Sequence, residues 1–108
     1  MYWNPEMSMH NFVRFEPKPG KEAEFIEAWK ALGDIFRALP NPPGPDQGIL
    51  IQDVTDPLLF YSVGPWRNSE DLTAMRANPQ AQAGIKQLED LCDDGVRGTY
   101  RLAASADV

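Results

Sequence analysis

The chain has 108 residues, which is enough for one domain and too few for a second hydrophobic core. Ten basic against sixteen acidic side chains give a net charge of −6, which argues against nucleic acid and anionic membranes as partners. The single cysteine, Cys92, excludes a disulfide framework within the chain and any cysteine-based zinc cluster.

We expect no targeting segment in this sequence. The N-terminus lacks the basic region of a signal peptide, and the longest purely hydrophobic run, 58–61, is far too short to span a membrane. We therefore expect a cytoplasmic protein. We also expect a loose extension over residues 1–8, one domain over 9–103 and a frayed tail over 104–108.

The first part of the chain is predicted to form a strand, a long helix and a stiff loop. Aromatic and β-branched residues favour a strand over 9–16, which Pro17 and Gly20 end. Prolines in 40–48 favour an extended connector rather than a PxxP ligand. Between them, an apolar stripe at spacings of three and four residues predicts an amphipathic helix. Its members are Phe25, Trp29, Leu32, Phe36 and Leu39.

A hairpin is predicted in the middle of the chain. Apolar runs over 48–54 and 58–63 are typical of strands, and the tight turn at 55–57 joins them.

Two helical segments follow the hairpin. Asn68 or Ser69 is expected to cap a short helix, and Asn78 with Pro79 is expected to restart the helix. Gly95 is expected to end this second segment in the left-handed conformation. Cys92 lies on the apolar side of the segment, where we interpret it as a small core residue.

The fold class follows from the order of these elements. An alternating strand over 96–103 completes the order β-α-β-β-α-β. This order predicts an α+β, ferredoxin-like domain in which two helices cover one face of a four-stranded antiparallel sheet.

The second face of that sheet is predicted to be covered as well. A solvated face would show a polar residue at every other strand position, but 49–51 and 58–61 are apolar without a break. Leaving several such side chains in water costs several kcal/mol at ~25 cal/mol per Å². We infer a homodimer that pairs sheet to sheet, the alternative being a monomer with an unusually apolar surface.

Motifs for metals and common cofactors are absent from the sequence. There is no glycine-rich phosphate loop, and no HExxH, GxSxG or CxxC motif. One histidine and one cysteine, His10 and Cys92, cannot build a strong metal site within one chain. We therefore expect neither a metal nor a nucleotide cofactor.

Three residues of the first strand are candidates for chemistry. His10 is the one side chain whose ordinary pKa lies near neutrality, so it is the natural general base. Its alternative is a structural histidine that touches solvent. Arg14 shares a strand face with His10 and Phe12, and a cation beside an aromatic ring suits an anionic aromatic ligand. Arg14 is equally suited to a salt bridge at the sheet edge.

Three further residues are candidates for an apolar pocket between sheet and helices. Tyr61, Trp66 and Met75 offer flat or adaptable surfaces, although each is also suited to the core. Trp66 follows Gly64 and Pro65 at a strand end, where a core residue is less expected and an indole can stack on a planar ligand.

Four short motifs, in this order and spacing, resemble the antibiotic biosynthesis monooxygenase family over about residues 11–102. They are Pro19-Gly20-Lys21-Glu22, Asp56-Pro57-Leu58-Leu59-Phe60, Trp66-x-x-Ser69 followed by Leu72, and Asn78-Pro79. The resemblance implies a dimeric α/β barrel of ferredoxin-like subunits.

The resemblance also implies oxygenation of aromatic, quinol or polyketide-like molecules without metal or flavin. The ionised substrate reduces dioxygen itself, while the protein favours the anion, holds the ring and excludes water. His10 would then act as the base, Arg14 as the partner of the anion, and Phe12, Tyr61 and Trp66 as ring walls. Trp66 corresponds to the family's tryptophan before the second helix, and Met75 lies nine residues after it, in that helix.

One departure from the family bears on activity. Haem-degrading relatives use an asparagine, a tryptophan and a histidine, and Met75 stands where family members often carry the histidine. Haem oxygenase activity is therefore not expected. A noncatalytic binding module or stress-associated module, and an isomerase or decarboxylase on the same barrel, remain alternatives to the cofactor-independent monooxygenase.

Overall fold

The computed structural model describes residues 9–40, 48–66, 68–101 and 103–104. The expected extension over 1–8, most of the proline-rich loop at 41–47 and the last residues, 105–108, lie outside the described residues. The elements in chain order are β1 (Met9–Pro17), α1 (Glu22–Arg37), β2 (Ile49–Gln52), β3 (Phe60–Trp66), α2 (Ser69–Ala77), α3 (Pro79–Asp90) and β4 (Cys92–Arg101).

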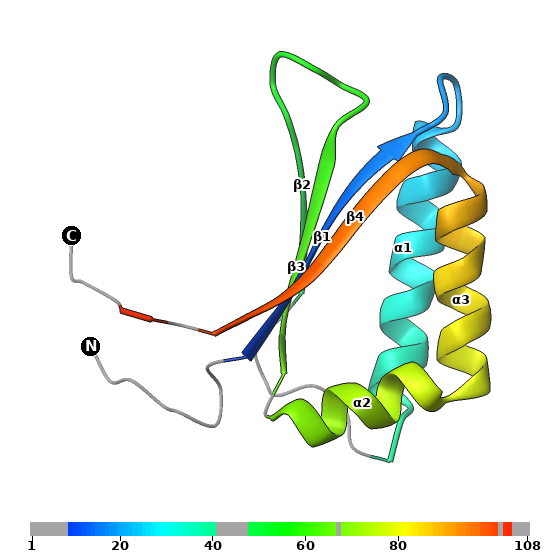
Figure 1. Cartoon of the computed structure of the whole chain (residues 1–108). Coiled ribbons are helices and arrows are strands. Elements are labelled where there is room, and N and C mark those ends of the chain that lie inside the picture. The colour runs from blue at the N-terminus through cyan, green and yellow to red at the C-terminus, as the bar shows by residue number, and fades with distance from the viewer. Residues whose placement is uncertain (1–8, 41–47, 67, 102, 105–108) are drawn as a thin grey trace.

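The four strands form one antiparallel sheet in the order β2-β3-β1-β4, with β1 and β3 at its centre. Helices α1 and α3 lie side by side over one face, and α2 lies across one end of the sheet (Figure 1). The predicted α+β, ferredoxin-like order is confirmed. The second helical region consists of two helices, α2 and α3, which meet at Asn78.

Side-chain caps account for the break between α2 and α3. Asn68 begins α2 by accepting a hydrogen bond from the Asp71 backbone N–H at 2.8 Å. Asn78 begins α3 by accepting from the backbone N–H groups of Gln80 and Ala81, with Pro79 in the first turn. Both predicted helix starts are confirmed, because each asparagine satisfies backbone donors that have no partner inside the helix.

The hydrophobic core has two parts under the helices. One part centres on the fully buried Phe25 of α1, which lies 5.1 Å from Phe15 and 5.2 Å from Phe60 between ring centroids. The second part gathers under α2 around Trp66 and Met75, each 2% exposed. The space between these two parts positions the candidate site.

The structure corrects the expected end of the last helix. α3 ends at Asp90, and Leu91 keeps a right-handed conformation after it. Gly95 does not cap the helix; it lies inside β4 opposite Phe15 of β1. Pairing with β1 satisfies the backbone groups of this segment from Cys92 onward, so the sheet prevails over the local glycine signal.

The hairpin is also shifted along the chain. β3 begins at Phe60 and runs through Trp66, so Leu58 and Leu59 belong to the turn. The Asp53 carboxylate holds this turn by accepting from the Thr55 backbone, the Thr55 hydroxyl and the Asp56 backbone. The same hydrogen bonds lower the pKa of Asp53, the Thr55 hydroxyl contributing most.

Cys92 lies at the start of β4 rather than on a helix. It is half-buried against the Phe25 part of the core, as the interpretation of a small core residue requires. Burial raises the pKa of its thiol from 9.0 to about 11, because desolvation disfavours the thiolate.

Two helical glycines provide a test of the α1–α3 packing. A Cβ on Gly84 of α3 would stand 2.8 Å from Leu32 Cδ1 of α1, whereas a Cβ on Gly33 would meet no atom within 4 Å. We expect Gly84→Leu to lower the free energy of unfolding by ~1–3 kcal/mol through overpacking. Gly33→Ala should raise it by ~0.5–1 kcal/mol by stiffening the helix. Urea unfolding at one fixed protein concentration measures both, and equal effects would contradict the packing.

The buried thiol provides a second test. With a pKa of about 11, the native Cys92 thiolate is scarce at pH 8, so alkylation by iodoacetamide should be slow. We expect the native rate to be at least ~10-fold below the rate of the urea-unfolded chain. Because the folded-state pKa is raised, the native rate should keep rising with pH up to about 11, whereas the unfolded rate should level off near 9. Equal pH profiles would show that Cys92 is not desolvated.

Candidate active site

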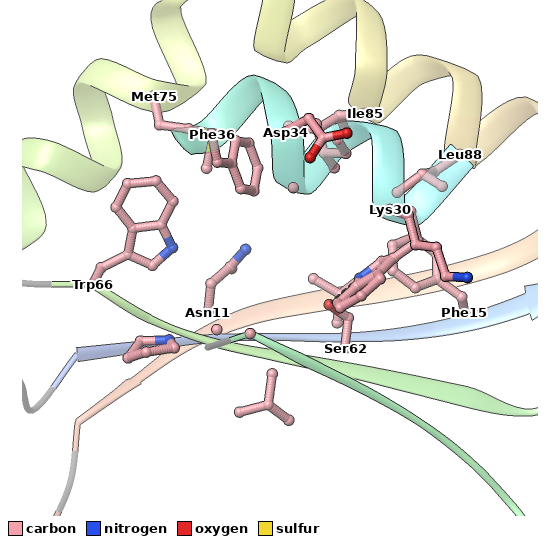
Figure 2. A pocket seen from close by; sticks show the side chains of 18 of the residues that line it. Asn11, Phe15, Lys30, Asp34, Phe36, Ser62, Trp66, Met75, Ile85 and Leu88 are labelled. Carbon is pink, nitrogen blue, oxygen red and sulfur yellow. Dashed lines mark hydrogen bonds between the residues drawn. The ribbon is translucent and has the colours of Figure 1, made fainter. Parts of the chain in front are cut away.

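A cavity of about 740 Å³ lies between the helices and the sheet. Its floor is formed by β1 and β3, and its roof by α1, α2 and α3 (Figure 2). Its volume lies within the range of pockets that bury a drug-sized ligand.

The floor combines small and polar side chains. Asn11 of β1 stands opposite Gly64 of β3, and the next pair along the same face is Val13 and Ser62. The Ser62 hydroxyl accepts a hydrogen bond from Trp29 Nε1 of α1 at 2.9 Å, which ties the sheet to the roof. A Cβ on Gly64 would meet no atom within 4 Å, so the cavity reaches the backbone of β3 there.

Aromatic and sulfur side chains form the wall under α2. Trp66 is the last residue of β3, and its ring contacts Phe36 of α1 edge to face, with ring centroids 5.6 Å apart. Met75 of α2 lines the same end of the cavity, and Figure 2 shows it above the indole. Flat rings beside an adaptable thioether suit a planar apolar ligand.

Charged side chains gather in the helices that line the cavity. Three cations and two carboxylates contribute to the lining; they are Lys30, Arg37, Arg76, Asp34 and Glu89. Arg37 pairs with Asp34 along α1, and Lys30 pairs with Glu27 at 3.5 Å. Arg76 reaches down to the sheet, where its Nη2 donates to Asn11 Oδ1 at 3.4 Å.

The structure brings only two of the six predicted site residues to this cavity. Trp66 and Met75 line it. Tyr61 does not, although the sequence suggested one pocket that included all three. Side chains alternate along a strand, and Trp29 fixes Ser62 on the helix side, so Tyr61 points to the opposite face.

The same alternation places the predicted residues of β1 outside the cavity. Asn11, Val13 and Phe15 face the helices, so His10, Phe12 and Arg14 face the other way. His10 and Arg14 are therefore not next to Trp66 within one chain, and the roles predicted for them stay predictions. Arg14 Nη2 makes a salt bridge to Asp94 at 3.0 Å, which is its structural alternative.

The open face of the sheet carries an aromatic cluster with apolar neighbours. The Phe12 ring lies 5.4 Å from Tyr61 and 5.7 Å from Tyr100 between centroids. Ile49 and Ile51 of β2 are each half exposed beside them. Apolar side chains thus occupy both faces of the sheet, as the unbroken apolar runs predicted.

Two polar lining residues, Asn11 and Arg76, were not singled out from the sequence. They come from β1 and α2 and are 65 positions apart, so no local motif joins them. The alternating pattern of β1 could have indicated Asn11, because it is a polar residue on the same strand face as Val13 and Phe15.

Within the described residues, no group of three or more His, Cys, Asp or Glu side chains could hold a metal ion. No helix in that part of the chain has the length and apolar character needed to cross a membrane.

Comparison with known proteins gives a consistent result for the fold. The family model described as "Antibiotic biosynthesis monooxygenase" matches residues 8–87. No curated protein matches the chain.

Solved structures resemble this one over nearly its whole length. A mutant of SnoaB, a cofactor-independent oxygenase from Streptomyces nogalater, superposes with a TM-score of 0.80 at 15% identity, covering 92% of this chain and 96% of that one. PA3566 from Pseudomonas aeruginosa gives 0.70 at 24% identity, covering 94% and 100%. A conserved protein from Methanosarcina mazei gives 0.74 at 17% identity, covering 90% and 95%. At these identities the likeness shows the fold alone.

Proposed function

The chain belongs to the antibiotic biosynthesis monooxygenase family, and we propose that it is a cofactor-independent monooxygenase. Its substrate would be a small aromatic, quinol or polyketide-like molecule, and its co-substrate dioxygen. The observation that carries this proposal is the cavity beside Trp66, which is large enough for a fused-ring compound and is walled by rings. SnoaB, which shares the fold, is itself a cofactor-independent oxygenase.

The proposed reaction uses electrons from the substrate. An ionised phenol or enol transfers one electron to dioxygen, and the resulting carbon radical and superoxide combine to form a C–O bond. Protonation gives a hydroperoxide, which loses water and leaves a ketone or quinone. The substrate therefore loses two hydrogen atoms and gains one oxygen atom, while the second oxygen atom leaves as water.

The protein's part is to hold the ring and to exclude water from the radical pair. Trp66, Phe36 and Met75 provide the surface against which the ring lies. The substrate proton leaves toward the charged lining, where Asp34 and Glu89 are exposed. His10 lies across the sheet from the cavity, so the proposal does not use it as the base.

Oxygen uptake tests this function. With a panel of anthrones and hydroquinones, in chelator and without added cofactor, we expect protein-dependent consumption of one dioxygen per substrate. With ¹⁸O₂, one labelled atom should enter the product and one should enter water. Oxygen uptake no faster than in protein-free buffer would contradict the proposal. Tight binding of the same compounds without uptake would instead support a noncatalytic binding module.

A cavity-filling variant tests the location of the reaction. Gly64→Val adds a branched side chain where the structure leaves space, so it should keep the fold and lower kcat/KM by at least ~10-fold. The control is Gly95→Ala in β4, which makes only ordinary contacts and lies outside the cavity lining. If Gly64→Val folds and retains full activity, the reaction does not take place in this cavity.

We further propose that the open face of the sheet is the interface of a homodimer. Ile49, Ile51 and Tyr100 are each at least half exposed there in the single chain, next to the Phe12 ring. A second copy would bury this surface by two-fold pairing of like with like. The aromatic cluster and its neighbours His10 and Arg14 would then belong to the interface, in agreement with the family's dimeric barrel.

The hairpin offers a matched pair of charge substitutions for the dimer. Ile51→Glu places a carboxylate in the middle of the apolar face, so it should convert a dimer into a monomer at micromolar concentration. Val54→Glu adds the same charge at the hairpin turn, where the side chain is 98% exposed, and should leave the dimer intact. Light scattering distinguishes the two states. A wild-type monomer at these concentrations would contradict the interface.

A further inference from the structure

Met75 is the one sulfur-containing side chain among the described residues that line the cavity. It lies in the last turn of α2, where its backbone oxygen accepts a hydrogen bond from the Asn78 N–H at 3.0 Å. Figure 2 shows its side chain reaching from α2 toward Phe36, above the Trp66 indole. A thioether is thus held at the end of the cavity that the aromatic rings form.

Little of Met75 is open to the surrounding water. Its exposed fraction is 2%, and it packs with Trp66, Leu72 and Ala81 in the second part of the core. Because Met75 also lines the cavity, a compound bound there contacts this side chain directly. Binding in the cavity is therefore what brings an oxidant to the thioether.

The cavity has room for one more atom on the sulfur of Met75. Its volume is about 740 Å³, and the floor is bare at Gly64, where a Cβ would meet no atom within 4 Å. A protein core without such a space resists even small additions of volume. One oxygen atom that points into the cavity therefore leaves the packing behind Met75 in place.

The proposed reaction forms a suitable oxidant in this cavity. Its hydroperoxide intermediate becomes a ketone or quinone by losing water, which requires a hydrogen on the carbon that carries the peroxide. A hydroperoxide whose carbon has no hydrogen cannot lose water in this way, so it persists beside Met75. Thioethers are oxidised to sulfoxides by such peroxides.

We propose that Met75 is a modification site, at which an aromatic hydroperoxide bound in the cavity transfers one oxygen atom to the thioether. The sulfur attacks the outer peroxide oxygen, so an S–O bond forms while the O–O bond breaks. The inner oxygen takes the proton of the outer one and leaves as an alcohol. The sulfur is oxidised by two electrons and the peroxide is reduced by two. The source of the hydroperoxide rests on the proposed function.

Oxidation of Met75 changes the character of the ligand-binding wall. A sulfoxide is polar, whereas the rings of Phe36 and Trp66 beside it suit an apolar ligand. A polar oxygen among these rings disfavours the binding of an apolar ring, because the oxygen loses its contact with water. The protein therefore inactivates itself with substrates whose hydroperoxide persists.

Two tertiary hydroperoxides test the site without any oxygenase reaction. Cumene hydroperoxide carries an aromatic ring, and tert-butyl hydroperoxide carries the same peroxide group without a ring. Trypsin releases Met75 in peptide 68–76 and the other three methionines in peptide 1–14, so mass spectrometry follows both. We expect cumene hydroperoxide to oxidise Met75 at least ~10-fold faster than tert-butyl hydroperoxide does, and both to oxidise peptide 1–14 at similar rates.

A matched pair of variants tests whether the cavity gives this selectivity. Gly64→Val fills the space in which the ring binds, so the rate ratio of the two hydroperoxides at Met75 should fall below ~3. Gly95→Ala lies outside the cavity lining and should keep the wild-type ratio.

Met75→Leu tests the consequence of oxidation. After treatment with cumene hydroperoxide, the wild-type protein should bind anthracene-9-methanol at least ~5-fold more weakly than before. Met75→Leu lacks the thioether, so its own affinity should be the same before and after the treatment. Fluorescence titration without oxygen measures both proteins.

Turnover under ¹⁸O₂ connects the site with the reaction. The hydroperoxide of 10-methylanthrone has no hydrogen on the oxygenated carbon, whereas that of anthrone has one and can lose water. With 10-methylanthrone we expect labelled oxygen in peptide 68–76. With anthrone we expect at least ~10-fold less label for each dioxygen consumed.

The outcomes separate the modification site from the reaction. Equal rates of Met75 oxidation by cumene and tert-butyl hydroperoxide, or uptake of oxygen with 10-methylanthrone and no label at Met75, would overturn the inference and leave the proposed function standing. Selective oxidation of Met75 in a protein that consumes no oxygen would support the site and refute the reaction. If Gly64→Val fails to fold, the wild-type rate ratio and Met75→Leu decide the matter.

Discussion

The alternation of side chains along β1 determines both surfaces that matter in this protein. β1 is a central strand, paired with β3 on one side and β4 on the other. Its side chains therefore alternate between the two faces of the sheet. Asn11 and Val13 face the cavity, while Phe12 and Arg14 face the open side. A slip of one residue in the pairing with β3 would exchange the two sets, which would place Phe12 on the cavity floor and Asn11 on the apolar face.

The cavity exists because the residues between the two parts of the core are small. Phe25, Phe15 and Phe60 fill the space at one end of the sheet, and Trp66 with Leu72 and Met75 fills it at the other. Between them the floor has Gly64 and the roof has Gly33, and neither would meet an atom within 4 Å if it carried a Cβ. Two glycines facing a common space leave it empty, whereas one Leu in either place would extend the core across it.

The sequence predicted the order of elements and the helix starts because these depend on local chemistry. Asparagine caps at positions 68 and 78 and the periodicity around Phe25 act within a few residues. The predicted start of β4 was wrong, because pairing with β1 and not the glycine at position 95 determines where this strand begins. The sequence also could not tell which face of the sheet Tyr61 occupies. That face depends on strand register, and register follows from pairing across the sheet. The contact of Asn11 with Arg76 joins residues of β1 and α2, so only the folded chain reveals it.

One sheet forms both the cavity floor and the proposed dimer interface, so these two sites depend on each other. The floor that would hold the substrate and the face that would meet a second subunit are the two sides of β1 and β3, with Ser62 and Tyr61 as adjacent residues of β3. Covering the aromatic cluster around Phe12 would oppose any slip in register, because a slip would transfer apolar rings away from their partner. Dimer formation would thus keep the Asn11 amide opposite Gly64. A weakened interface should therefore impair substrate binding in the cavity even though no interface residue touches the substrate.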